Sequence, residues 1–209
     1  MKPLSLLARQ WGATAVPFGL VNAEDWLETA SAQQALNCLS QTAALRSVLL
    51  LSGPNGVGKS ALVGRWMRSL DTRWFCPVCL TQATLSGTAI LAALATKLGK
   101  PVFFQRQRNL QLLQEALQEL ERRILVVILD EAQNYIQPSL EEVRLLLGLN
   151  LPEQPAFALV LIGDEYLLAS LKLRNQRALY SRLGCQVSLT PGPRRNVRNI
   201  WAPGSPPWA

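Results

Sequence analysis

Histidine is absent from this sequence of 209 residues, and cysteine occurs only four times. Without histidine, hydrolases that pair a serine or cysteine nucleophile with a histidine base are excluded. The cysteines are few and scattered, which favours a reducing compartment over a disulfide framework. Cys76 and Cys79 have the spacing of a zinc or redox pair. With no second pair and no histidine, a four-ligand zinc site is hard to assemble, so we interpret both as buried thiols.

Long apolar runs and acidic residues are also scarce. No stretch approaches the length of a membrane span, and the first ten residues lack the apolar core of a signal peptide. We therefore expect a cytoplasmic protein with no membrane partner. The formal net charge is +7. Such an excess permits double-stranded DNA as a partner without demonstrating it, because a mild basic balance often serves only solubility.

The most informative stretch runs from Gly53 to Ser60 and reads GPNGVGKS. It matches the phosphate-loop pattern G-x-x-x-x-G-K-[ST], with an apolar strand expected before it and a helix after it. A chance match would occur roughly once in a hundred chains of this length, and these flanks lower that figure further. The residues expected to contact the nucleotide are Gly53, Pro54, Asn55, Gly56, Val57, Gly58, Lys59, Ser60 and Ala61.

Each residue type in this loop has a specific task. The three glycines let the backbone turn tightly around a phosphate chain, and the start of the following helix adds a positive field. Lys59 supplies a mobile charge for the terminal phosphates, and the Ser60 hydroxyl can ligate Mg²⁺. The loop therefore predicts binding of ATP with Mg²⁺.

A second motif follows the apolar run 124–129, where Asp130 and Glu131 stand in sequence. Acids at the carboxyl end of a parallel strand lie where ligands bind in such sheets. Asp130 can hold Mg²⁺ through its water shell, and Glu131 can orient or deprotonate the attacking water. An acid in this position often merely caps a helix, and alone the two interpretations would be equal. Together with a phosphate loop, the pair predicts the second half of an NTPase site.

Two further residues are candidates for catalysis. Asp164 follows the apolar run 156–162 and could sense the terminal phosphate or cap the next helix, and we weigh these interpretations equally. Arg174 and Arg177 fit a solvated helix face. Arg182, which precedes the last expected strand, is the second candidate.

The remaining chain alternates apolar strands with amphipathic helices, which predicts an α/β fold with a parallel sheet covered on both faces. Residues 1–21 form an irregular lead-in, 22–191 the ATPase domain, and 192–209 a flexible tail rich in Pro, Arg and Trp. The helices expected are 22–44, 59–70, 85–98, 109–123, 138–147, 166–171 and 174–183, and the strands are 47–51, 73–80, 124–129, 156–162 and 185–189.

Taken together, these motifs resemble the AAA+ ATPases of the ExeA-like group, which includes the TniB-like and MuB-like ATPases of transposition systems. The resemblance covers residues 15–191. It consists of Val16–Phe18, the loop Gly53–Ser60, the DEAQ signature Asp130–Gln133, the stretch Leu145–Gly163, and Arg182 ahead of Leu189-Thr190-Pro191.

The resemblance implies a three-layer α/β/α P-loop fold with a five-stranded parallel sheet in the order 5-1-4-3-2. The strand containing Pro77 is then at an edge, as proline's missing N–H independently indicates. It also implies homo-oligomers that hydrolyse ATP at subunit interfaces, with Arg182 acting on the neighbouring site. Family members continue into a helical lid, whereas the residues from Gly192 onward do not resemble one.

Three functions follow as hypotheses. The first is an ATP-hydrolysing accessory factor of DNA transposition that binds double-stranded DNA as an oligomer and recruits a transposase. The second is a secretion ATPase of the ExeA kind, which normally continues into a membrane span and an envelope-binding part. The third is a lidless nucleotide-binding switch that hardly hydrolyses ATP.

Overall fold

A computed structural model describes residues 29–81, 86–150, 154–173 and 177–191. By its internal contacts the chain divides into two units, one formed by Met1–Ala30 with Pro191–Ala209 and the other by Ser31–Thr190. The first unit lies almost wholly outside the described residues, as do the predicted lead-in 1–21 and tail 192–209.

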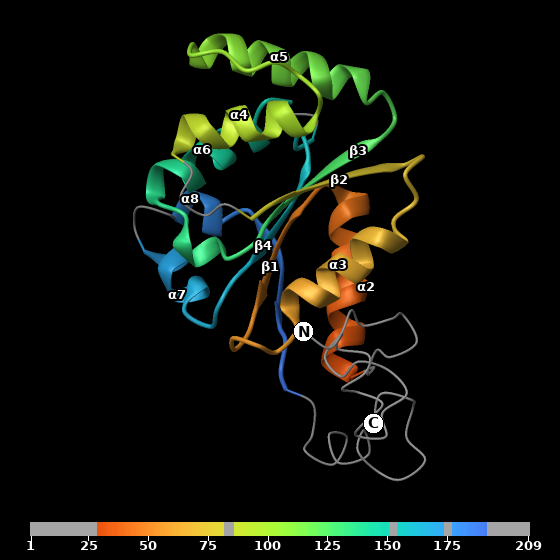
Figure 1. Cartoon of the computed structure of the whole chain (residues 1–209). Helices are drawn as coiled ribbons and strands as arrows, with labels where there is room; N and C mark the ends of the chain where they lie inside the picture. The colour runs from red at the N-terminus through yellow and green to blue at the C-terminus, as the bar shows by residue number, and fades with distance from the viewer. Residues whose placement is uncertain (1–28, 82–85, 151–153, 174–176, 192–209) are drawn as a thin grey trace, which may run out of the picture. The chain divides into compact units, whose positions relative to one another are not determined.

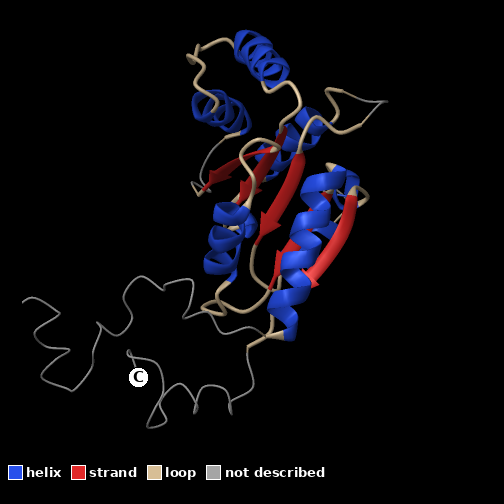
Figure 2. Ribbon diagram, turned by 90° about the vertical axis from the view of Figure 1, so that its right-hand side faces the viewer, coloured by secondary structure: helices blue, strands red, loops and turns tan. Residues whose placement is uncertain are grey.

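The second unit is built on one five-stranded parallel sheet (Figure 2). The strand order β2-β3-β4-β1-β5 is the predicted 5-1-4-3-2 read from the other side, so the predicted fold is confirmed. Pro77 lies in β2, an edge strand that pairs with β3 and with no other strand of the described residues, as expected of a residue without an N–H. The strands are β1 (Val48–Ser52), β2 (Phe75–Leu80), β3 (Ile124–Leu129), β4 (Ala158–Ile162) and β5 (Leu183–Ser188).

Helices cover both faces of this sheet, α2 and α3 on one and α4, α6, α7 and α8 on the other, where α5 packs on α4 (Figure 1). The central strands β3 and β4 are almost continuously buried because apolar side chains on both of their faces meet helices. None of the described helices is long and apolar enough to cross a membrane. The helices are α2 (Ala30–Leu45), α3 (Lys59–Ser69), α4 (Gly87–Lys97), α5 (Arg106–Glu119), α6 (Gln137–Leu147), α7 (Leu167–Lys172) and α8 (Arg177–Tyr180), with the 3-10 turn η2 (Ala132–Asn134) after β3.

Several element boundaries differ from the expectations. Residues 22–28 of the first predicted helix lie outside the described residues, and its described part is α2, which begins at Ala30 after Thr29, a residue type favoured just before a helix. Helix α5 starts and ends earlier than predicted, because apolar spacing marks only the buried part of a helix and misses its exposed first turn. The predicted helix 174–183 is reduced to the short α8 in its described part, since Leu183 already pairs with Val48 as the start of β5.

Candidate functional site

The predicted site residues, with the exception of Arg182, gather at one edge of the sheet. All strands are parallel, so their carboxyl ends lie at the same edge, and β1 and β3 both flank β4 (Figure 1). The loop 53–58 follows β1, Asp130 and Glu131 follow β3, and Asp164 follows β4 closely. The loop, the two acids and the candidate sensor thus lie together at the carboxyl ends of three neighbouring strands, β1, β3 and β4.

Glycine is required at several positions of the loop for different reasons. Gly56 and Gly58 have φ values of 79° and 97°, in the left-handed region that side chains strongly disfavour. Gly53 lies so close to the backbone carbonyl of Leu189 that a Cβ atom there would clash with it. The Leu189 N–H donates to the Ser52 carbonyl at 2.8 Å, so the end of β5 passes directly beside the start of the loop.

Lys59 is the first residue of α3, and only 7% of its surface is exposed. Its ammonium group donates to the carbonyls of Gly53 at 2.8 Å and Pro54 at 3.0 Å. The loop therefore encircles its own lysine, and the charge is held at the centre of the turn. Ser60 follows with an exposed side chain at the amino end of the same helix.

A hollow of about 280 Å³ joins the loop to the second motif. Its lining combines glycine backbone, a cation, a hydroxyl and a carboxylate, the groups that a phosphate chain with Mg²⁺ requires, so the residues present fit that ligand. Gly53, Pro54 and Val57 are not among the lining residues, although they were expected to contact nucleotide. The lining residues are Asn55, Gly56, Gly58, Lys59, Ser60, Ala61 and Glu131.

The two acids after β3 have different surroundings. Asp130 is half-buried, and one of its carboxylate oxygens accepts the N–H of Glu131 at 3.0 Å. Glu131 is exposed, lines the hollow and has a φ of 52°, which is uncommon for a residue with a side chain. Backbone strain of this kind concentrates at functional sites, where it aims a side chain that an ordinary turn would place elsewhere.

Gln133 is a site residue that the sequence patterns did not single out. Its amide nitrogen donates to the Glu131 carboxylate at 2.6 Å, and its amide oxygen accepts the Asp164 N–H at 3.3 Å. The amide fits because residue 163 is glycine: a Cβ atom there would lie 2.8 Å from the Gln133 oxygen. One side chain thus ties Glu131 to the end of β4. The DEAQ signature was the available signal, although nothing in it indicates this bridge.

Asp164 and Arg182 take up positions of different kinds. The Asp164 carboxylate accepts the N–H groups of Tyr166 and Leu167 at 3.0 Å each, which is the helix-capping interaction, and its sensor role stays a prediction. Arg182 immediately precedes β5 and therefore lies at the amino-terminal edge of the sheet, opposite the phosphate loop. There its guanidinium donates to the Arg144 carbonyl at 2.7 Å. It is not part of the site of its own chain.

The cysteines form no site within the described residues, which contain no cluster of three or more potential metal ligands. Cys76 and Cys79 are three positions apart on β2, so they face opposite sides of the strand, and they are half-buried instead of buried as predicted. Burial, reinforced by the nearby Asp130, raises the pKa of Cys79, which opposes thiolate chemistry. Burial likewise raises the pKa of Tyr135 to about 12, and its hydroxyl donates to the Leu80 carbonyl.

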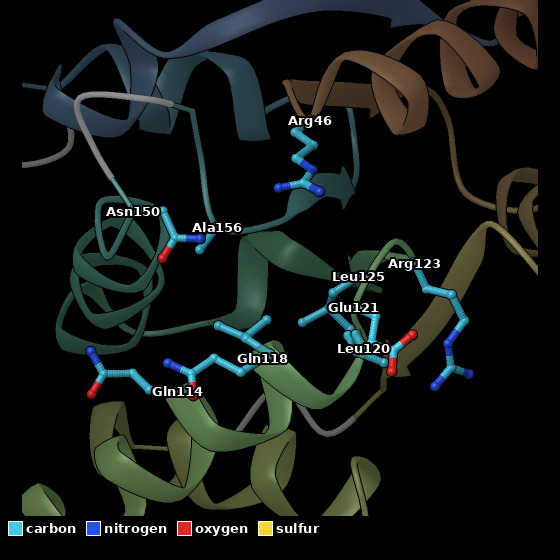
Figure 3. A pocket seen from close by; sticks show the side chains of 10 residues that line it. Arg46, Gln114, Gln118, Leu120, Glu121, Arg123, Leu125, Asn150 and Ala156 are labelled. Carbon is cyan, nitrogen blue, oxygen red and sulfur yellow. The ribbon is translucent and has the colours of Figure 1, made fainter.

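A second, larger hollow of about 360 Å³ lies at the opposite edge of the sheet (Figure 3). Arg46 extends toward it and Arg123 points away from it. Arg46 directly follows α2 and Glu121 lies two residues after α5, with φ values of 49° and 51°, and a left-handed residue commonly reverses the chain at such helix ends. This hollow has no phosphate loop and no paired acids among its lining residues, so the smaller hollow is the candidate nucleotide site.

Comparison with known proteins fits this geometry. A family described as an AAA domain matches residues 43–171, which contain both motifs. The chain belongs to the AAA domain family. The match ends before Arg182, and the ExeA-like group within the family stays a prediction. A search of curated proteins found no match.

Solved structures share the fold of this AAA domain at low sequence identity. Cdc6p from Pyrobaculum aerophilum has a TM-score of 0.64 at 20% identity, over 88% of this chain and 50% of that one. The ORC2 protein of Aeropyrum pernix, in ADPNP–ADP complexes, has 0.60 at 19%, over 82% and 49%. Drosophila ORC bound to DNA has 0.54 at 16%, over 81% and 31%. The chain thus spans about half the length of the Cdc6p and ORC2 chains.

Proposed function

We propose that this AAA protein hydrolyses ATP with Mg²⁺ as an oligomer on double-stranded DNA, and that it serves a transposase as an accessory factor in the cytoplasm. The observation that carries the ATPase part is the shared hollow, where Lys59 and Ser60 from one motif meet Glu131 from the other. The four free cysteines fit a reducing compartment.

The residues in and next to the hollow have complementary roles in hydrolysis. Lys59 binds the terminal phosphates and neutralises the charge that develops on them. Ser60 and Asp130 would hold Mg²⁺, which supplies charge neutralisation between the phosphates when bound. Glu131 accepts a proton from the attacking water or orients it, and Gln133 fixes the carboxylate through its 2.6 Å hydrogen bond.

Oligomerisation is proposed because Arg182 and the phosphate loop lie at opposite edges of one sheet. An arginine so placed can meet a terminal phosphate only on another subunit, where it would stabilise the transferred group. The DNA part is supported by the +7 charge and by the fold shared with Drosophila ORC, a protein whose solved structure has DNA bound. The transposition part depends on the resemblance of the DEAQ and Arg182 motifs alone.

The test is ATP turnover at rising protein concentration, with and without double-stranded DNA. We expect turnover per subunit to increase with concentration and to be stimulated by DNA. Turnover that is strictly proportional to protein and unaffected by DNA would contradict the oligomer and the DNA partner. Tight ATP binding without turnover under any condition would replace the ATPase by a nucleotide-binding switch.

Lys59→Ala is expected to abolish ATP binding, with a loss of affinity of at least about 100-fold, because it removes the charge-assisted contacts to the phosphates. It also removes the two hydrogen bonds that the ammonium makes within the loop. The measurement is titration calorimetry with a non-hydrolysable ATP analogue. Lys172→Ala, a lysine in the last turn of α7, is the matched control and should bind like the wild type.

Gln133→Ala is expected to lower turnover by about ten-fold while ATP affinity and unfolding temperature stay unchanged, since one positioning hydrogen bond is lost from the catalytic carboxylate. Steady-state kinetics and calorimetry on the same preparation separate these quantities. Gln118→Ala removes an exposed glutamine at the other edge and serves as control. A parallel fall in ATP affinity would mean that Gln133 shapes the pocket instead of orienting Glu131.

A further inference from the structure

The segment that connects α4 to α5 exposes apolar side chains in an unusual way. Val102 and Phe103 are 47% and 45% exposed, and Phe104 at 111% is exposed as fully as in an unfolded chain. A phenylalanine outside any apolar contact gains nothing for folding stability. An exposed aromatic side chain beside two further exposed apolar residues is typical of an interaction surface.

This segment is held in place by a buried side chain. Asn109 is only 4% exposed, and its amide nitrogen donates to the Phe103 carbonyl at 2.8 Å. Its amide oxygen accepts the Phe103 N–H, also at 2.8 Å. Ion pairs anchor both flanks, Lys100 with Glu119 at 2.6 Å and Arg106 with Glu142 at 2.7 Å. Phe104 is therefore exposed on a segment that these contacts hold in place. Binding through its ring would cost little conformational entropy, because the segment is already ordered.

The residues next to the aromatic ones in the sequence carry only positive charge, although two of these cations pair with acids from elsewhere in the fold. No aspartate or glutamate occurs between Thr72 and Gln114, although cations do. The Arg108 guanidinium lies over the Phe103 ring, 5.7 Å from its centre. The cations of this stretch are Arg73, Lys97, Lys100, Arg106 and Arg108.

We propose that residues 100–108, here called the aromatic segment, bind nucleic acid, with Phe104 stacking on or wedging between bases and the Arg108 guanidinium contacting a phosphate. Aromatic rings interleaved with arginine and lysine recognise bases and backbone together. An apolar protein partner would cover Phe104 but would also bury Arg108, whereas a nucleic acid engages both. The inference deepens the proposed function, because it names the surface through which the protein holds its DNA.

The test is binding of the full chain, with ATP and Mg²⁺, to a fluorescein-labelled DNA duplex and to one of its single strands, measured by fluorescence anisotropy over a salt series. Phe104→Ala is expected to weaken binding by about ten-fold without changing the salt dependence, since stacking releases no counterions. Arg108→Ala is expected to lower the slope of log affinity against log salt by about one. Phe104→Trp keeps an aromatic ring at this position and should therefore bind DNA like the wild type, unlike Phe104→Ala.

Trp74→Ala is the matched control, because it removes a ring that is 53% exposed but lies outside the aromatic segment, and it should bind like the wild type. A greater loss on the single strand than on the duplex indicates stacking on exposed bases, and a greater loss on the duplex indicates a wedge. Equal binding by wild type and Phe104→Ala would overturn this inference and leave the proposed function intact. Failure of the wild type to bind either DNA would overturn both.

Discussion

Glu131→Gln is expected to keep the ATP affinity of the wild type and to lower turnover by on the order of 10²–10⁴-fold, the usual contribution of a general base. Glutamine has almost the same shape as glutamate but cannot take a proton from water. Its amide oxygen can still accept the hydrogen bond from Gln133, which holds the present carboxylate at 2.6 Å. The substitution therefore isolates proton transfer from positioning.

The measurement is single-turnover hydrolysis with saturating ATP, alongside calorimetric binding. Glu115→Gln, a neutralised exposed acid on α5, controls for the change in net charge and should hydrolyse ATP normally. Full turnover in Glu131→Gln would exclude Glu131 as the base. The neighbouring Asp130 would then be the acid to substitute next, because its carboxylate contacts the Glu131 backbone at 3.0 Å.

Arg182→Ala is expected to leave ATP binding by the dilute protein unchanged and to lower turnover at high concentration by on the order of 10³-fold. The physical reason is the placement of Arg182 at the edge of the sheet opposite the phosphate loop, where its charge cannot act on its own nucleotide. Arg177→Ala removes an exposed arginine of the short helix α8 just upstream and should have little effect.

A mixing experiment separates a catalytic from a structural role of Arg182, which also donates to the Arg144 carbonyl at 2.7 Å. Glu131→Gln subunits retain Arg182, and Arg182→Ala subunits retain Glu131. If the arginine acts across an interface, mixing the two inactive variants recovers part of the turnover. A mixture that stays inactive, together with a lowered unfolding temperature of Arg182→Ala, would show that Arg182 only supports the end of α6.

The sequence by itself determined the sheet and the core of the site, because their signals are local. Five apolar runs correspond to the five strands, and the proline in β2 marked its edge position through a missing N–H. The glycines and Lys59 act within a few residues of one another, so their spacing predicted the turn that now encircles the ammonium. The paired acids Asp130 and Glu131 were predicted from their position directly after one apolar strand.

Tertiary structure decided whatever depends on residues far apart in the chain. The Gln133 bridge needs β3 and β4 side by side and a glycine at position 163, which no local pattern signals. Cys38 and Cys185, remote in sequence, become neighbours between α2 and β5, where burial and their hydrogen bond raise the pKa of Cys185 to about 11. The full exposure of Phe104 could not be predicted from the sequence either. An apolar residue is expected to be buried, and only the packing of α4 and α5 leaves this side chain outside the core.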